Sequence, residues 1–277
     1  MKIAVLSGKG GAGKTFLAVN LAAALGKATY VDCDVEEPNG RLFLKPEVTG
    51  TQDVFQMIPS FDAQKCTGCK KCVNFCRFHA LIYIKKAPML FTEVCHSCGG
   101  CSLVCPDQAI CEVPRPIGVV QQGMSSQTRV LTGVLNTGEA SGIGVIQKAL
   151  SLSQKDDTVI IDCPPGSACS VQESIRDADF CLLAAEPTAF GFQNFQMVWE
   201  LAVLHGKPCG VEINKQETPY APLEQFCQEH EIPILLRIPY DRDLGGRIAD
   251  GQLLARQDPA FRKALLTMAD QIGGLCR

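Results

Sequence analysis

The stretch Ser7-Gly8-Lys9-Gly10-Gly11-Ala12-Gly13-Lys14-Thr15 decides the fold of this 277-residue chain. It follows the apolar run Lys2–Leu6, which favours a strand. It opens residues 15–25, whose apolar side chains recur at helical spacing. A glycine-rich loop that ends in Gly-Lys-Thr between a strand and a helix satisfies the phosphate-loop pattern in its required context.

The glycines of this loop allow backbone N–H groups to converge on phosphate oxygens at the positive end of the following helix. Lys14 is expected at the β- and γ-phosphates, and the Thr15 hydroxyl is expected to ligate Mg²⁺. A glycine-rich turn without a ligand is the alternative. The candidate nucleotide contacts in the loop are Gly8, Gly10, Gly11, Ala12, Gly13, Lys14 and Thr15.

Outside residues 60–115, β-rich runs alternate with amphipathic helical stretches along the chain. This alternation predicts an α/β fold with a mostly parallel, doubly wound sheet that helices cover on both faces. Strands are expected at residues 2–6, 28–33, 117–121, 129–135, 158–162, 179–185, 209–214 and 234–237. Helices are expected at residues 15–25, 143–153, 192–205, 221–230 and 259–272.

Composition narrows the class of protein. Hydrophobic residues make up 46% of the chain and charged residues 20%, which fits a globular core. A net charge of −3 gives no broad electrostatic basis for binding nucleic acid. No apolar run approaches the ~18 residues that a membrane span needs, and no signal-peptide core follows Met1. We therefore expect a cytoplasmic protein without a stable membrane anchor.

Residues 60–115 interrupt the α/β pattern. They carry a net charge of +3 inside a chain whose net charge is −3, and they lack a long helical period. This predicts a discontinuous domain of residues 1–59 and 116–277, with residues 60–115 inserted as a small α+β domain. Such a short insert has little core of its own, so its folding is expected to depend on metal clusters bound by the cysteines described next.

Two cysteine runs with identical spacing mark the insert. Each run reads Cys-x2-Cys-x2-Cys-x3-Cys, the spacing of bacterial two-cluster ferredoxins, in which the fourth cysteine ligates the other cluster. Arg77 departs from this pattern, because it replaces the usual proline after the first run. One [4Fe–4S] cluster is expected on Cys66, Cys69, Cys72 and Cys105, and a second on Cys95, Cys98, Cys101 and Cys76.

Zinc is the alternative for the eight cysteines, because two tetrahedral sites also use Cys-x2-Cys pairs. The matched spacing and the proline after the second run favour the ferredoxin interpretation. Half of the sixteen cysteines lie outside the runs, singly among apolar residues, and are expected to be small buried side chains. These are Cys33, Cys111, Cys163, Cys169, Cys181, Cys209, Cys227 and Cys276.

Residues 8–15 resemble the deviant Walker A loop of the MinD/ParA/Mrp and nitrogenase iron protein families. The resemblance implies that Lys9 reaches the nucleotide across a dimer interface, with a solvated surface lysine as the alternative. Tyr30-Val31-Asp32-Cys33-Asp34 resembles the Asp-x-Asp motif of these families, in which the second aspartate orients the attacking water. The resemblance thus implies Lys9, Lys14 and Asp34 as catalytic residues.

Two further segments carry the resemblance, which covers residues 1–57 and 116–277. Residues 159–166 resemble Walker B running into switch II, which implies that Asp162 holds Mg²⁺ through water and that Gly166 senses the γ-phosphate. Residues 211–215 resemble the strand whose terminal asparagine, here Asn214, reads adenine. Cys169 lies in the switch II region and is either a nucleotide-responsive thiol or a plain buried one.

Together these segments resemble MinD-superfamily ATPases that carry an inserted ferredoxin domain. The resemblance implies an ATPase that uses ATP and Mg²⁺, forms a homodimer on binding ATP and has a redox or cofactor-assembly protein as its partner. It would couple nucleotide state to electron transfer or to Fe–S or metallocofactor assembly. The alternatives are a carrier or scaffold for Fe–S clusters and a MinD-like positioning ATPase. The last is disfavoured because residues 261–266 contain two basic residues and read as a packing helix.

Overall fold

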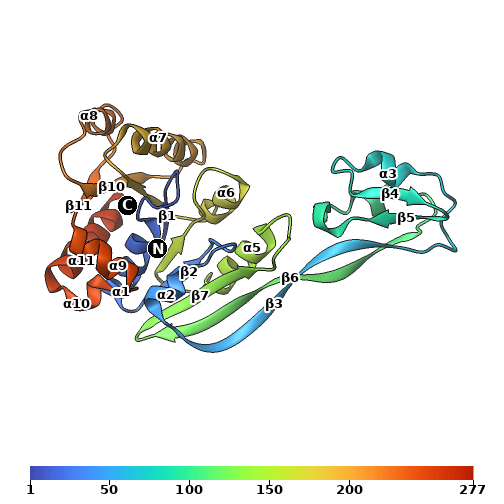
Figure 1. Cartoon of the computed structure of the whole chain (residues 1–277), viewed down its shortest axis with the longest axis horizontal. Coiled ribbons are helices and arrows are strands. Elements are labelled where there is room, and N and C mark those ends of the chain that lie inside the picture. The colour runs from blue at the N-terminus through green and yellow to red at the C-terminus, as the bar shows by residue number, and fades with distance from the viewer. Residues whose placement is uncertain (277) are drawn as a thin grey trace.

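The computed structural model describes residues 1–276 and contains one large sheet of nine strands (Figure 1). The strand order is β11-β10-β9-β1-β8-β2-β7-β6-β3. Its strands are β1 (Lys2–Leu6), β2 (Thr29–Asp32), β3 (Glu47–Phe61), β6 (Ile110–Ser125), β7 (Thr128–Leu135), β8 (Val159–Asp162), β9 (Phe180–Ala185), β10 (Cys209–Gln216) and β11 (Ile234–Pro239).

Helices pack against both faces of this sheet. One face buries apolar side chains of α5, α6, α7 and α8, and the other buries those of α1 and α11. The helices of this part are α1 (Lys14–Leu25), α2 (Gly40–Leu44), α5 (Ile143–Leu152), α6 (Cys169–Ile175), α7 (Ala189–Leu204), α8 (Ala221–Glu229), α9 (Arg242–Ala249), α10 (Leu254–Gln257) and α11 (Pro259–Leu275). The predicted mostly parallel α/β sheet is therefore confirmed. Within residues 1–276, no helix combines the length and apolar character needed to cross a bilayer.

Two antiparallel strands at one edge distinguish this sheet from a purely parallel one. β6 pairs antiparallel with both β7 and β3. The sequence pattern predicted only residues 117–121 as a strand here, whereas β6 spans sixteen residues and β3 was not expected at all. β3 is an edge strand with most of its side chains exposed or half-buried, so its sequence lacks the apolar pattern of a covered strand.

The outer parts of β3 and β6 form an arm, defined here as residues 55–61 and 110–117. β7 pairs with β6 only between Gly118 and Ser125, whereas β3 continues to pair with β6 as far as Ile110. Because β6 runs opposite to the parallel strands, the arm leaves the sheet at their carboxyl ends (Figure 1). Eight residues at ~3.3 Å each give a reach of roughly 26 Å.

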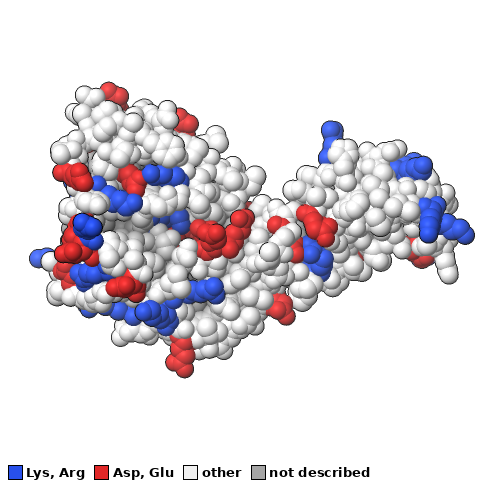
Figure 2. All heavy atoms as spheres, viewed as in Figure 1, with Lys and Arg blue, Asp and Glu red and all other residues white. Residues whose placement is uncertain are grey.

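Residues 62–109 form a distal module at the end of the arm (Figure 1). Its elements are α3 (Lys71–Phe75), β4 (Leu81–Ile84), β5 (Ala87–Leu90), η1 (Thr92–Val94) and α4 (Gly100–Leu103). β4 and β5 pair as a separate two-stranded sheet. The buried apolar side chains of the module are few: Cys72, Ala80, Leu81 and Ala109 belong to this set. Figure 2 shows Lys and Arg side chains toward the free end of the module.

Candidate functional site

The loop between β1 and α1 requires glycine at several positions. Gly11 and Gly13 have φ values of 81° and 99°, a backbone conformation that residues other than glycine rarely adopt. A Cβ at Gly13 would lie 1.8 Å from Asn214 Nδ2, and one at Gly8 would lie 2.1 Å from the Asn194 carbonyl oxygen. The loop thus takes a compact form just before the N-terminus of α1, where anions bind favourably.

Lys14, the first residue of α1, is buried against the end of β8. Its Nζ lies 2.6 Å from Asp162 Oδ1. Burial alone would lower the pKa of Lys14, but the Asp162 carboxylate outweighs it and the pKa is raised. The Thr15 hydroxyl lies 3.5 Å from Lys14 Nζ. A hydroxyl and a carboxylate near a phosphate loop are the oxygen donors that suit Mg²⁺.

Asp162 belongs to a buried network that the sequence analysis did not identify. Tyr30 donates its hydroxyl hydrogen to Asp162 Oδ2 at 2.7 Å. Asp32 lies beside Asp162 in the register of β2 and β8, and it accepts the Gly40 N–H at 3.0 Å. Burial and the neighbouring Asp162 charge raise the pKa of Asp32 to about 8. The sequence signal for Tyr30 is its hydroxyl group, because this polar group lies in a strand that is buried along its whole length.

Two switch segments meet beside this network: switch I, which begins at Asp34, and switch II, which follows Asp162. Asp34 is half-buried and lines a cavity of about 260 Å³ together with Pro164 and Pro165. Partial burial raises the pKa of Asp34, although Lys14 offsets part of that effect. The Gly166 N–H donates to the Ser7 carbonyl at 2.9 Å. In this conformation Gly166 is therefore bonded to the phosphate loop itself.

Lys9 and Asn214 both contact partners within their own chain. Lys9 forms an ion pair with the buried Glu186, which also lies 2.6 Å from Lys215 Nζ. Burial opposes ionisation, but these two lysines hold the pKa of Glu186 below its usual range. Asn214 Nδ2 donates to the Ala12 carbonyl at 2.9 Å, so it supports the loop. The adenine role of Asn214 stays a prediction, and no sequence motif pointed to Glu186 or Lys215 as residues of this site.

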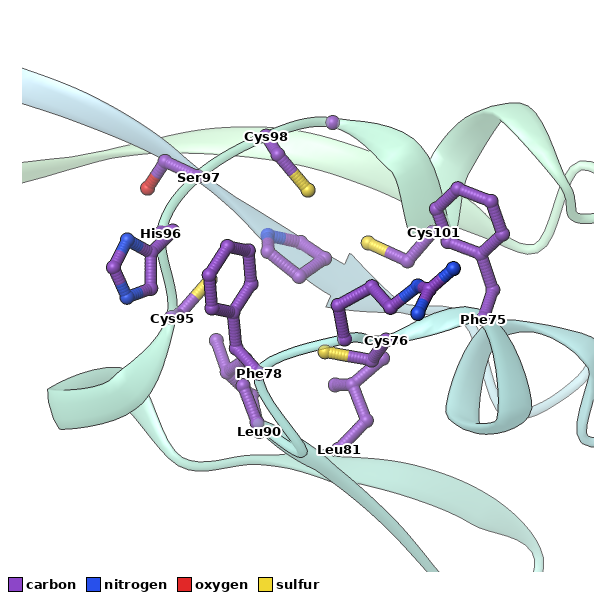
Figure 3. A pocket seen from close by; sticks show the side chains of 14 residues that line it. Phe75, Cys76, Phe78, Leu81, Leu90, Cys95, His96, Ser97, Cys98 and Cys101 are labelled. Atoms are coloured by element: carbon purple, nitrogen blue, oxygen red, sulfur yellow. The ribbon is translucent and has the colours of Figure 1, made fainter.

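The eight clustered cysteines line two cavities in the distal module. One cavity is lined by Cys66, Cys69, Cys72 and Cys105, and the other by Cys76, Cys95, Cys98 and Cys101. Each cavity takes three cysteines from one run and the fourth from the other run. Figure 3 shows the sulfur atoms of Cys76, Cys98 and Cys101 turned toward the space inside the second cavity.

The surroundings of the cysteines are apolar. Phe78 stacks on His96 with ring centroids 3.8 Å apart at the cavity of Figure 3, and Leu81 and Leu90 line its floor. The Ala109 N–H donates to Cys105 Sγ at 3.3 Å in the other cavity. Across residues 1–276, no three His, Cys, Asp or Glu side chains are gathered closely enough to hold a metal ion. Thiol donors in an apolar enclosure are the chemistry that Fe–S clusters use.

The remaining cysteines depart in part from the expected burial. Cys33, Cys163, Cys181 and Cys227 are buried and Cys209 is half-buried. The expectation is wrong for the other three, which are exposed because they lie on the arm, at the start of α6 and near the end of α11: Cys111, Cys169 and Cys276. Cys169 is therefore not a plain buried thiol, and its role as a switch thiol stays a prediction.

Comparison with known proteins places the chain in a family. Residues 3–254 match the family model "CobQ/CobB/MinD/ParA nucleotide binding domain". One uncharacterised protein of Methanocaldococcus jannaschii is 26% identical to this chain, over 87% of both sequences. A second uncharacterised protein of that organism is 33% identical, over 68% of both sequences. An iron–sulfur cluster carrier protein of Pyrococcus horikoshii is 48% identical over 68 residues, which are 21% of this chain and 23% of that protein.

Solved structures share the fold. The cell division ATPase MinD of Pyrococcus furiosus gives a TM-score of 0.60 at 20% identity, over 99% of this chain and 98% of that one. The septum site-determining protein MinD of Pyrococcus horikoshii, complexed with Mg-ADP, gives a TM-score of 0.60 at 19% identity, over 98% and 95% of the two chains. The phosphate loop, the Asp162 strand end and the family match agree, and this chain belongs to the CobQ/CobB/MinD/ParA nucleotide-binding family.

Proposed function

We propose that the protein is a Mg²⁺-dependent ATPase whose nucleotide state controls electron transfer through two [4Fe–4S] clusters in the distal module. The observation that carries this proposal is the position of the two four-cysteine cavities. They lie at the tip of an arm that leaves the sheet at the carboxyl ends of the parallel strands, the same end as the phosphate loop. The clusters would supply one-electron chemistry at low potential. On this proposal residues 1–59 and 116–277 are the ATPase domain and residues 60–115 are the inserted ferredoxin domain.

Each residue of the site has a separate role in the proposed nucleotide hydrolysis. The loop N–H groups and Lys14 would bind phosphate oxygens, while the Thr15 hydroxyl would ligate Mg²⁺ and Asp162 would hold the ion through water. Asp34, which lines the cavity between the two switches, orients the attacking water. Lys9 acts on the nucleotide of a second copy, so it must first leave its ion pair with Glu186. The ATP-bound dimer is therefore the hydrolysing form.

Backbone contacts join switch I to the base of the arm. The Val35 carbonyl, next to Asp34, accepts the Leu135 N–H at 2.8 Å. The following Asn136 N–H donates to the Ile117 carbonyl at 2.9 Å, where the arm leaves the sheet. Arg115 on the arm also holds Glu139 through a bidentate ion pair with one contact of 2.7 Å. A movement of switch I would thus reach the arm through the two successive backbone contacts, with the Arg115–Glu139 ion pair as a further attachment, rather than through a flexible linker.

This connection predicts that ATP changes the reduction potential of at least one cluster. Couplings between sites usually amount to ~1–3 kcal/mol, which for a one-electron couple is roughly 40–130 mV. Reduction of the clusters must then change ATP affinity by the same free energy. Potentiometric titration followed by EPR, without nucleotide, with ADP and with a non-hydrolysable ATP analogue, measures the shift.

The Glu139→Gln variant is a matched test of this coupling, because it weakens the Arg115 contact and leaves the nucleotide site untouched. Its nucleotide-dependent potential shift should shrink while its nucleotide affinity stays at the wild-type value. Identical potentials and identical access of iron chelators in all three nucleotide states of the wild type would leave the module as a passive docking arm. That outcome would contradict the coupling.

The role of Lys9 across the dimer gives a separate prediction. Lys9→Ala should keep much of the nucleotide affinity of the monomer but lose ATP-dependent dimerisation and hydrolysis, because its target lies on the partner copy. Nucleotide titration at low protein concentration and light scattering with an ATP analogue check the two properties. Lys27→Ala, an exposed lysine after α1, should change neither. Equal loss of monomer binding in Lys9→Ala and Lys14→Ala would rule out the action in trans.

A carrier or scaffold for Fe–S clusters is the second candidate, and the short similarity to an iron–sulfur cluster carrier protein supports it. Transfer of iron and sulfide to an apo acceptor, with depletion of the donor, would favour this function over electron transfer. A cell-division positioning role has less support. α11 buries Leu265, Met268 and Ile272 in the core, and Arg262 donates to the Ala24 carbonyl, so this helix is a packed element of the domain.

A further inference from the structure

We propose that Tyr30 is a positioning residue that holds Asp162 for the magnesium-bound nucleotide and links this carboxylate to helix α2. The inference rests on the proposed ATPase function and assigns a residue outside the phosphate loop and the switches. Tyr30 lies in the middle of β2 and is completely buried. Its ring packs in the core between the sheet and α1.

The hydroxyl of Tyr30 has a specific polar partner. It donates to Asp162 Oδ2 at 2.7 Å, while Lys14 holds the other oxygen, Oδ1, at 2.6 Å. A phenol inside an apolar core costs free energy unless its hydroxyl is hydrogen-bonded, so phenylalanine would serve equally well for packing alone. The oxygen atom of Tyr30 is therefore explained by Asp162 and not by the core.

The two hydrogen-bond donors to Asp162, Lys14 and Tyr30, are expected to respond differently when nucleotide binds. Lys14 belongs to the phosphate loop and is expected to turn toward the phosphate oxygens, which releases Oδ1. Among the described side chains, Tyr30 is then the remaining hydrogen-bond donor on this carboxylate. It keeps Oδ2 directed into the protein and leaves Oδ1 facing the site, where an ordered carboxylate binds a cation without first losing rotational freedom.

Tyr30 also touches the start of α2. A Cβ at Gly40, the first residue of α2, would lie 2.0 Å from the Tyr30 hydroxyl oxygen, so the helix backbone lies directly against this group. The Gly40 N–H in turn donates to Asp32 Oδ2 at 3.0 Å. A change in the position of the Tyr30 hydroxyl must therefore move α2 or be resisted by it.

The far end of α2 is attached to both strands that form the arm. The Leu44 carbonyl, at the end of α2, accepts the hydroxyl of Ser125, the last residue of β6. β3 begins at Glu47, three residues after α2 ends. The contacts Asp162–Tyr30–Gly40–Leu44–Ser125 thus run from the candidate magnesium ligand to the inner end of the arm strands.

The Tyr30→Phe variant tests this role, because it removes one oxygen atom and keeps the ring. Nucleotide affinity without divalent cation should stay within twofold of the wild type. Affinity for Mn²⁺ in the presence of ADP, measured by EPR of the free ion, should fall about tenfold, the usual weight of a hydrogen bond to a charged group. Hydrogen exchange at residues 40–44 should respond to Mg-ADP in the wild type and not in the variant.

Tyr220→Phe is the matched control, since Tyr220 loses the same atom on the opposite face of the sheet and should match the wild type in every measurement. A Tyr30→Phe protein with wild-type Mn²⁺ affinity would overturn the proposal. Equal weakening of nucleotide binding with and without cation would assign Tyr30 a merely structural role and would also overturn it. A wild-type protein that binds no nucleotide would reject the proposed ATPase function instead.

Discussion

Lys14→Ala should lower nucleotide affinity about 10- to 100-fold and hydrolysis about 100- to 1,000-fold. The substitution removes the ammonium group expected at the β- and γ-phosphates, and it also leaves Asp162 without its partner at 2.6 Å. Removal of one member of a buried ion pair is strongly destabilising, by about 3–5 kcal/mol. Calorimetric nucleotide titration and phosphate release measure the functional losses, and thermal unfolding measures the structural one.

Two further variants separate these effects. Lys14→Gln keeps a hydrogen-bond donor near Asp162 but carries no charge, so it should unfold closer to the wild-type temperature and still fail to hydrolyse ATP. Lys155→Ala removes an exposed lysine just before β8, at the amino ends of the parallel strands and away from the nucleotide loop, and should leave both properties unchanged. Substantial ATP hydrolysis by folded Lys14→Gln would contradict the assignment of residues 7–15 as the catalytic phosphate loop.

The nucleotide-binding part of the fold could be predicted because its signals are local. β1 was predicted with the same bounds as observed, and α1 begins one residue earlier than predicted, at Lys14, which follows Gly13 in a left-handed conformation. α7 also begins earlier than predicted, at Ala189, because the Thr188 side chain accepts the Gly191 N–H and caps the helix. A threonine cap does not change the spacing of apolar residues, so the spacing alone does not show where this helix begins.

The arm could not be predicted, because strand pairing and polar contacts rather than burial in a core hold it in place. Phe55 and Met57 are about half exposed, and β3 near them is polar along much of its length, so no alternation of buried and exposed positions marks the strand. The long-range contacts around the nucleotide loop were missed for a related reason. Glu186 and Lys215 are far apart in sequence from Lys9, and only the fold brings these three side chains together.

Cys76→Ala should lower the iron and sulfide content from eight of each per chain to about four of each, the difference of one [4Fe–4S] cluster. Cys76 lines the cavity of Cys95, Cys98 and Cys101 and not that of its own run. The lost cluster should therefore be that of the second run. Anaerobic reconstitution, followed by iron and sulfide analysis and by EPR of the reduced protein, measures the content and identifies the surviving cluster.

Double variants test which cluster depends on Cys76. The Cys76→Ala/Cys95→Ala variant alters one cavity and should keep about four irons, whereas Cys76→Ala/Cys66→Ala alters both cavities and should keep almost none. Cys111→Ala is the control, because Cys111 is exposed on the arm outside both cavities and its loss should leave all eight irons. The opposite ranking of the double variants would place each cluster on its own run. Two zinc ions without sulfide, in protein made with ample iron, would overturn the proposed electron-transfer function itself, because zinc has no redox chemistry.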